Sequence, residues 1–131
     1  MNKINKEEIS SILREHKRWL DSEGRTGRRA DLTGAELPDI NLKDAELSYA
    51  RLNNSNLSNA VLDGAVLYRT ELERAKLTGA KIRHANLTKA YLRQADLEGA
   101  DMTATILTDA NLTKACLKDT TLRFVSGYEK L

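Results

Sequence analysis

The sequence predicts an all-β solenoid built from five-residue units, and three observations support this fold class. A large aliphatic residue occupies every fifth position from Leu32 to Leu122, with seventeen Leu plus Ile82 and Met102 in nineteen positions. Two residues before each aliphatic, from Ala30 to Thr120, the residue is usually small and is Ala in fourteen of nineteen cases. Two residues after each aliphatic, ten of nineteen positions hold Gly, Asp or Asn, the residues that best tolerate turns and positive φ.

A period of five excludes the two common regular elements. On an α-helix five residues advance about 500°, so successive leucines would encircle the rod. On a continuous strand an odd period sends alternate leucines to opposite faces. The small residue and the leucine of one unit are two apart, which places both on one side of an extended segment. Each unit is therefore a short extended piece followed by a corner, and Leu and Ala supply the core of a chain with only 5% aromatic residues.

The outward charges predict how many units close one coil. If four units make a coil, residues 20 apart are neighbours on adjacent rungs, where opposite charges are favoured. At that spacing residues 30–124 contain nine opposite pairs and one like pair, Arg69/Lys89. Spacings of 15 and 25 give three opposite pairs each, with two and six like pairs. The opposite pairs at spacing 20 are Asp31/Arg51, Arg51/Glu71, Lys43/Asp63, Asp63/Arg83, Glu73/Arg93, Lys76/Asp96, Lys81/Asp101, Lys89/Asp109 and Glu98/Lys118.

Units such as Ala30-Asp31-Leu32-Thr33-Gly34 and Ala95-Asp96-Leu97-Glu98-Gly99 resemble the A-(D/N)-L-x-x motif of the pentapeptide-repeat family. The resemblance covers residues 30–124. It implies a right-handed quadrilateral β-helix, here of just under five coils.

Residues 1–29 are expected to form a capping helix and a lead-in loop, because a solenoid exposes core and backbone edges at its ends. Asn5 and Glu8 read as a capping box, and Ile4 and Ile9 as its hydrophobic staple. An apolar stripe follows, which predicts a helix over about residues 6–22 with Gly24 as a stop. The stripe consists of Ile9, Ile12, Leu13, His16 and Leu20, and we expect it to cover the first coil.

Residues 125–131 form a C-terminal tail with no comparable helix pattern. Either this tail folds across the last coil, or two solenoids meet there. Family members that act on topoisomerases join through their C-terminal coils, so the resemblance makes a homodimer one of the two expectations. The candidate dimer end comprises Phe124, Val125, Tyr128 and Leu131.

No constellation for catalysis, a metal or a cofactor is present in the sequence. The single cysteine, Cys116, excludes a disulfide or a CxxC pair within the chain, and no histidine is placed to activate it. His16 belongs to the apolar stripe and is expected in the core, while His84 falls at an outward corner. Gly-rich phosphate loops and nucleophile elbows are missing. We therefore expect no enzyme and no cofactor.

The candidate partner patch is a group of outward apolar residues on a polar solenoid: Tyr49, Val66, Tyr68 and Ile106. The preference of β-branched and aromatic residues for strands is a strong alternative explanation, and the interpretation as a contact patch is weighed against it. A basic cluster in the N-terminal segment is the other candidate, with a solvated helix face as its alternative; it consists of Arg14, Lys17, Arg18, Arg25, Arg28 and Arg29.

The expected function is a non-enzymatic protein–protein interaction scaffold or adaptor whose partner is another protein. The alternative is a DNA mimic that modulates a type II topoisomerase, as some family members do. Those members carry a pronounced negative surface, whereas residues 30–124 hold twelve basic against thirteen acidic residues, a net charge of −1. The charged N-terminus and the missing apolar span lead us to expect a cytoplasmic protein that binds no membrane. The near-neutral charge of the repeats leads us to expect no nucleic-acid partner. The segment from His16 to Gly27 resembles the lead-in of many bacterial members of the family, which implies a bacterial protein.

Overall fold

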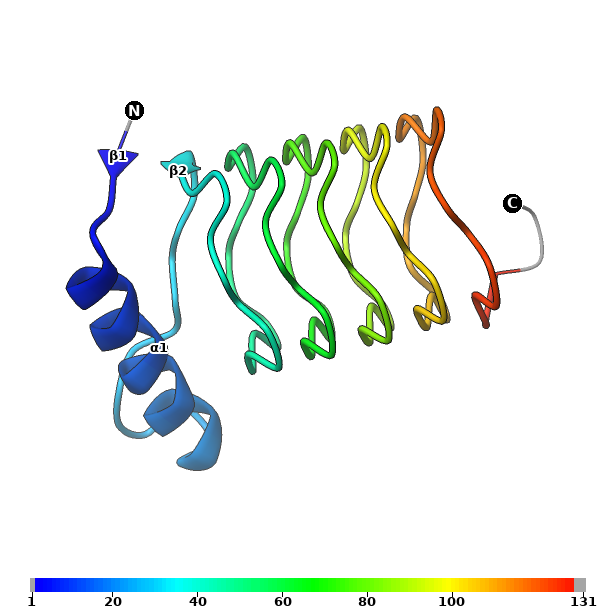
Figure 1. Ribbon diagram of the computed structural model, residues 1–131. Helices are drawn as coiled ribbons and strands as arrows, with labels where there is room; N and C mark the ends of the chain where they lie inside the picture. Colours follow the sequence, from blue (N-terminus) through cyan, green and yellow to red (C-terminus); the bar gives the residue numbers. More distant parts are fainter. Residues whose placement is uncertain (1, 129–131) are drawn as a thin grey trace.

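A computed structural model describes residues 2–128 and shows a solenoid with a helix at its N-terminal end (Figure 1). The elements in order are β1 (Asn2–Lys3), α1 (Lys6–Asp21) and β2 (Ala35–Glu36), and β1 pairs with β2 in parallel. The coils stack from the helix towards the C-terminus. No helix among residues 2–128 is long and apolar enough to cross a membrane.

Parallel single-residue bridges join the stacked coils at a constant spacing of 20 residues, as in Asp31↔Arg51, Arg51↔Glu71 and Glu71↔Tyr91. Four five-residue units therefore complete one coil, as the charge pattern predicts. Four of the predicted charge pairs stand directly opposite each other in such bridges: Asp31/Arg51, Arg51/Glu71, Lys76/Asp96 and Lys81/Asp101. Extended strands beyond β1 and β2 do not develop in residues 2–128, because a corner interrupts the chain within every unit.

Every corner has the same backbone conformation. In eighteen of the nineteen units, all except that of Ile82, the N–H three residues after the inward aliphatic donates to the carbonyl of that aliphatic, as Ala60 does to Leu57 at 3.0 Å. The residue before this donor has positive φ in all nineteen units, from 54° at Arg69 to 71° at Gly34. Nine of these residues are neither Gly, Asp nor Asn, so the fold imposes a conformation that costs an ordinary L-residue roughly 1–2 kcal/mol.

The inward positions form one continuous core of Leu and Ala. Leu47, Leu52 and Leu57 are fully buried, and the same holds along most of the solenoid. The inward hydroxyls donate to carbonyls of inward aliphatic residues: Ser55 donates to Leu52 and Thr70 to Leu47, each at 2.7 Å. Buried polar groups that keep their hydrogen bonds cost little stability.

Helix α1 begins where the sequence predicts, with Asn5 as N-cap accepting the Glu8 N–H at 2.9 Å. The helix ends at Asp21, Ser22 is the C-cap, and Glu23 takes positive φ before Gly24. Ile9 is buried against the first coil, as the hydrophobic stripe predicts. Helix α1 does not cover all of this end, because an apolar groove of about 720 Å³ separates it from Leu37 and Ile40.

The C-terminal end is less buried than the middle of the solenoid. Ala115, Leu117 and Leu122 are inward residues that stay half-exposed, and no further coil covers them in the described chain. Val125 and Tyr128 pack partly against this end. The core therefore ends in a partly open apolar layer.

Candidate interaction surface

The structure places the four residues of the predicted patch on one face and its corner, but separates them along the solenoid. Val66 and Ile106 belong to the column of bridges Glu46↔Val66, Val66↔Asn86 and Asn86↔Ile106, so Asn86 lies between them. Tyr68 packs edge-on against Tyr49, with ring centroids 5.6 Å apart. Tyr49 and Tyr68 are thus brought together, and Ile106 lies two rungs away.

The tyrosine pair continues into the N-terminal helix. The Trp19 indole contacts the Tyr49 ring edge-on at 6.4 Å between centroids, and it stacks on the His16 imidazole at 5.7 Å. His16 itself is fully buried. A line of rings therefore runs from the core of the helix–coil junction to the outer surface at Tyr68.

Tyr91 joins this group from the adjacent face. It is 45% exposed, stands above Glu71 in the bridge column, and lines the same hollow of about 290 Å³ as Tyr49 and Arg69. Tyr91 and Trp19 are absent from the predicted patch, because that prediction groups residues of one face and its corner, whereas this surface extends to the adjacent face and to α1. We call Trp19, Tyr49, Tyr68 and Tyr91 the aromatic corner.

Charged residues beneath the aromatic corner are closely paired. The Arg29 Nη2 lies 2.7 Å from Glu71 Oε2, and its Nε donates to the Tyr49 carbonyl. Asn53 donates to the other Glu71 oxygen at 3.0 Å, and Arg51 approaches Glu71 at 3.6 Å. Arg29, one residue of the predicted basic cluster, is therefore engaged with the first coils.

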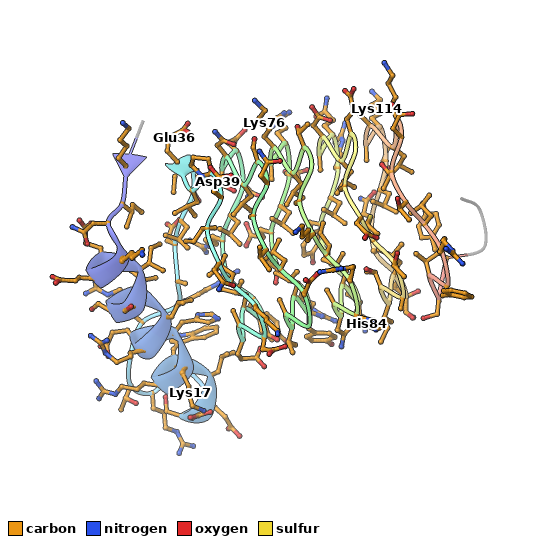
Figure 2. The ribbon with its side chains drawn as sticks, viewed as in Figure 1. Lys17, Glu36, Asp39, Lys76, His84 and Lys114 are labelled. Atoms are coloured by element: carbon orange, nitrogen blue, oxygen red, sulfur yellow. The ribbon has the colours of Figure 1, made fainter. Side chains whose placement is uncertain are left out.

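The other basic residues of the N-terminal segment lie along α1 and the following loop. Lys17 pairs with Asp21 and Arg18 with Glu15, both at 3.0 Å and well exposed. Pairs of this kind contribute little to stability. Figure 2 shows Lys17 on the C-terminal half of α1.

Arg69 differs from the arginines around it. Its guanidinium carbon lies 5.7 Å from the Tyr68 ring centroid, within cation–π distance. Its Nε is buried and has no hydrogen-bond partner in the described residues. The guanidinium also lowers the pKa of the Tyr68 hydroxyl below its usual value.

The candidate dimer end is partly exposed. Phe124 is 75% exposed, with the Arg123 guanidinium 5.3 Å from its ring centroid. Val125 and Tyr128 are half-buried, and Leu131 lies outside the described residues. Phe124 and Tyr128 are the only aromatic residues of the chain outside the aromatic corner.

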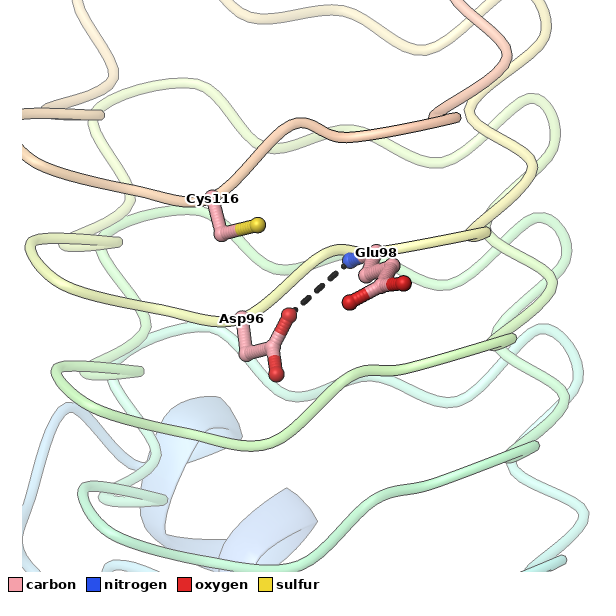
Figure 3. Close-up of side chains that lie close together, drawn as sticks. All are labelled: Asp96, Glu98 and Cys116. Atoms are coloured by element: carbon pink, nitrogen blue, oxygen red, sulfur yellow. Dashed lines mark hydrogen bonds between the residues drawn. The ribbon is translucent and has the colours of Figure 1, made fainter.

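One group of three potential metal ligands occurs in the described residues: Asp96, Glu98 and Cys116, whose ligand atoms lie within 4.8 Å of one another (Figure 3). The Glu98 N–H donates to Asp96 Oδ1 at 3.1 Å, and Lys118 lies 4.0 Å from Glu98. These contacts are the same turn and charge-pair interactions that recur along the solenoid. His84 is exposed (Figure 2) and does not belong to this group.

Sequence comparison matches the chain to the model of a family described as pentapeptide repeats. It finds eight copies, in matches at residues 28–62, 45–83, 55–94 and 85–123. No curated protein matched the chain.

Three solved structures are similar to much of this chain. A pentapeptide repeat protein from the thylakoid lumen of Arabidopsis thaliana is 23% identical, with a TM-score of 0.59 over 72% of this chain and 63% of that one. Rfr23 from the cyanobacterium Cyanothece 51142 is 26% identical, with a TM-score of 0.53 over 86% and 93%. HetL from Nostoc, a protein involved in regulating heterocyst differentiation, is 35% identical, with a TM-score of 0.52 over 74% and 44%.

Proposed function

Because the chain belongs to the pentapeptide-repeat family, we propose that it is a non-enzymatic scaffold that binds another protein through its aromatic corner. The distribution of aromatic side chains supports this proposal. The chain has one Trp, four Tyr and one Phe, and four of these six residues form the aromatic corner. Tyr and Trp are enriched at protein interfaces, where they bury much area at low entropic cost.

The core does not require these rings, since Leu and Ala fill it throughout. Tyr91 and Tyr49 project outward from the solenoid, and their side chains are 45% and 37% exposed. Exposed aromatic side chains gathered beside a hollow are typical of a contact surface. The rigid ladder of bridges holds them in place before a partner arrives, which lowers the entropic cost of binding.

Site-specific photocrosslinking tests this surface directly. A benzophenone amino acid replaces Tyr91 in one protein and Lys81, on the opposite face, in a control. The proposal predicts that a partner is crosslinked from position 91, and that Tyr68→Asp with Ile106→Asp prevents the crosslink while circular dichroism stays unchanged. Equal crosslinking from both positions would reject the aromatic corner as the binding surface.

We also propose that two copies associate through the C-terminal end. The support is the half-exposed inward layer of Leu117 and Leu122, together with the exposed Phe124 ring. Light scattering should then give a dimer mass that falls to the monomer mass in Phe124→Glu. A monomer at tens of micromolar in the wild type contradicts this association.

The finer description of the solenoid is part of the same proposal. We infer right-handed winding and just under five coils over residues 30–124, between a capping segment 1–29 and a tail 125–131. The nineteen regular corners and the similarity to solved pentapeptide repeat proteins support it. A bacterial, cytoplasmic origin stays a prediction.

The DNA-mimic alternative is not favoured by the surface. Acidic side chains on the solenoid alternate with basic side chains, as in the Arg83–Asp63 pair at 2.6 Å. Residues 30–124 carry a net charge of only −1. We expect gyrase supercoiling to be unchanged by micromolar protein.

A further inference from the structure

Arg69 and Lys89 are the exception in the charge pattern of the coils. They are 20 residues apart, and the Arg69 N–H donates to the Thr88 carbonyl at 3.0 Å, so they occupy neighbouring rungs of one edge. Like charges on adjacent rungs disfavour each other. Within residues 2–128 neither side chain forms an ion pair within 4.0 Å; from Arg29 onward, the described cations that do are Arg29, Arg51, Arg83 and Lys118.

One N–H donor of the Arg69 guanidinium also lacks an acceptor in the described residues. A guanidinium carries five N–H donors in a fixed fork, and the Arg69 Nε is buried with no partner among the described residues. Leaving a buried donor without an acceptor costs stability. The Tyr68 ring and the hollow lined by Tyr49 and Tyr91 border this guanidinium.

Two cations that form no ion pair within 4.0 Å in the described residues, beside three tyrosines, complement an anion that carries apolar neighbours. We propose that Arg69 and Lys89 bind an Asp or Glu side chain in an acidic, partly apolar segment of the protein partner, whose apolar residues pack on Tyr49, Tyr68 and Tyr91. This assignment rests on the proposed scaffold function and specifies the chemistry of its partner. Planar pairing of arginine with a carboxylate satisfies two donors at once.

The surroundings favour an isolated carboxylate over a polyanion. Glu71 and Glu73 line the same hollow as Arg69. Glu71 is neutralised by Arg29, but both carboxylates remain acceptors that repel a continuous phosphate backbone. A single carboxylate between apolar side chains avoids this repulsion.

A random-peptide display library, selected in parallel on wild type and on Arg69→Gln, tests the assignment. Wild type is expected to enrich peptides with Asp or Glu beside apolar residues, and Arg69→Gln to lose that acidic preference. A selected peptide is then synthesised with its acidic residues and with Asn or Gln in their place. The amide version should bind wild type about tenfold more weakly, as when one partner of a charge-assisted contact is removed.

Matched variants separate this site from general charge effects. Lys89→Gln should weaken the acidic peptide, Lys81→Gln on the opposite face should leave it unchanged, and added salt should weaken binding. Thermal unfolding of each variant verifies that the fold is retained. Any of three results overturns the assignment. The selection yields no peptides, it yields peptides without acidic residues, or the amide version of the peptide binds as tightly as the acidic version.

Failure of the carboxylate assignment can be distinguished from failure of the scaffold function. Crosslinking from position 91 without any acidic preference leaves the scaffold in place and rejects the carboxylate site. Loss of both results rejects the surface itself. Tighter binding of a phosphorylated peptide or of an RNA than of the acidic peptide also overturns the proposal.

Discussion

The buried Nδ1 of His16 in helix α1 accepts a hydrogen bond at 2.9 Å from the backbone N–H of Ala30, the first residue of the repeat region. The Nε2 atom lies 2.9 Å from the Ser48 carbonyl oxygen. A backbone N–H can only donate and a carbonyl can only accept, so the ring is neutral with its proton on Nε2. One imidazole therefore connects the helix to two points of the first coil.

The stability of the protein should decrease as the pH falls through the range of this histidine. Burial lowers the pKa of His16 below its ordinary value of 6.5, outweighing the Ser48 hydrogen bond and the charge of Glu46. The unfolded chain then binds more protons than the folded one, so this contribution is fully present above pH 6.5 and is lost below it. Denaturant unfolding between pH 8 and about pH 5 measures the slope.

Two variants attribute the slope to the correct histidine. His16→Gln should be less stable than wild type at pH 8. Its unfolding free energy should also lose the part of the pH dependence that His16 causes. His84→Gln, which changes an exposed corner residue, should keep the wild-type profile. A full slope in His16→Gln contradicts the prediction.

Gly27→Ala should weaken docking of the helix far more than Gly34→Ala. Both glycines have positive φ, 74° and 71°, so each alanine has a similar backbone cost, roughly 1 kcal/mol. A Cβ on Gly27 would also clash with the backbone of Glu15 and Trp19, whereas one on Gly34 meets no atom within 4 Å. Denaturant unfolding should therefore show a loss larger by about 2 kcal/mol or more in Gly27→Ala; equal losses contradict the clash.

The carboxyl group of Asp63 should titrate below its ordinary value because of Arg83. The guanidinium binds both carboxylate oxygens, with Nη2–Oδ2 at 2.6 Å and Nε–Oδ1 at 3.1 Å, and this hydrogen bonding is the main cause of the lowered pKa. NMR titration of the side-chain carboxyl carbon should show the shift in wild type and a return towards the ordinary value of 3.8 in Arg83→Gln. The contribution of the Asp63–Arg83 contact to the stability of the fold is fully present above pH 3.8 and is lost as the pH falls below that value.

Lys118→Gln is the matched control for that titration. Lys118 lies 4.0 Å from Glu98 and is 70% exposed, so its removal should leave the Asp63 titration unchanged. An unshifted Asp63 in wild type contradicts the bidentate contact.

Leu77→Ala and Leu122→Ala should differ in their cost although they change the same repeat position. Leu77 is 1% exposed inside the solenoid, so its truncation should cost about 2–5 kcal/mol in unfolding free energy. Leu122 is half-exposed at the C-terminal end, so less contact is lost there. Unfolding free energies of both variants, measured at several protein concentrations, test this difference. If two copies associate through this end, the cost of Leu122→Ala should depend on protein concentration.

The sequence alone determined the solenoid, its period and its register. Nineteen inward pairs on a fixed spacing can be buried together only if the chain turns once per unit, and the charge pairs 20 apart then specify four units per coil. Asn5 and the apolar stripe likewise predicted α1 closely. These features can be predicted because they depend on contacts between neighbouring units. The same contacts recur in every unit and therefore leave a regular pattern in the sequence.

Only the tertiary structure decided the corner conformations and the composition of the candidate surface. Tyr49 and Arg69 take positive φ, which their residue types do not suggest, because hydrogen bonds with the neighbouring coils impose the turn at every unit. Trp19 and Tyr91 join Tyr49 from an N-terminal helix and an adjacent face. Such contacts depend on the orientation of non-repeating elements, and a single period in the sequence carries no information about that orientation.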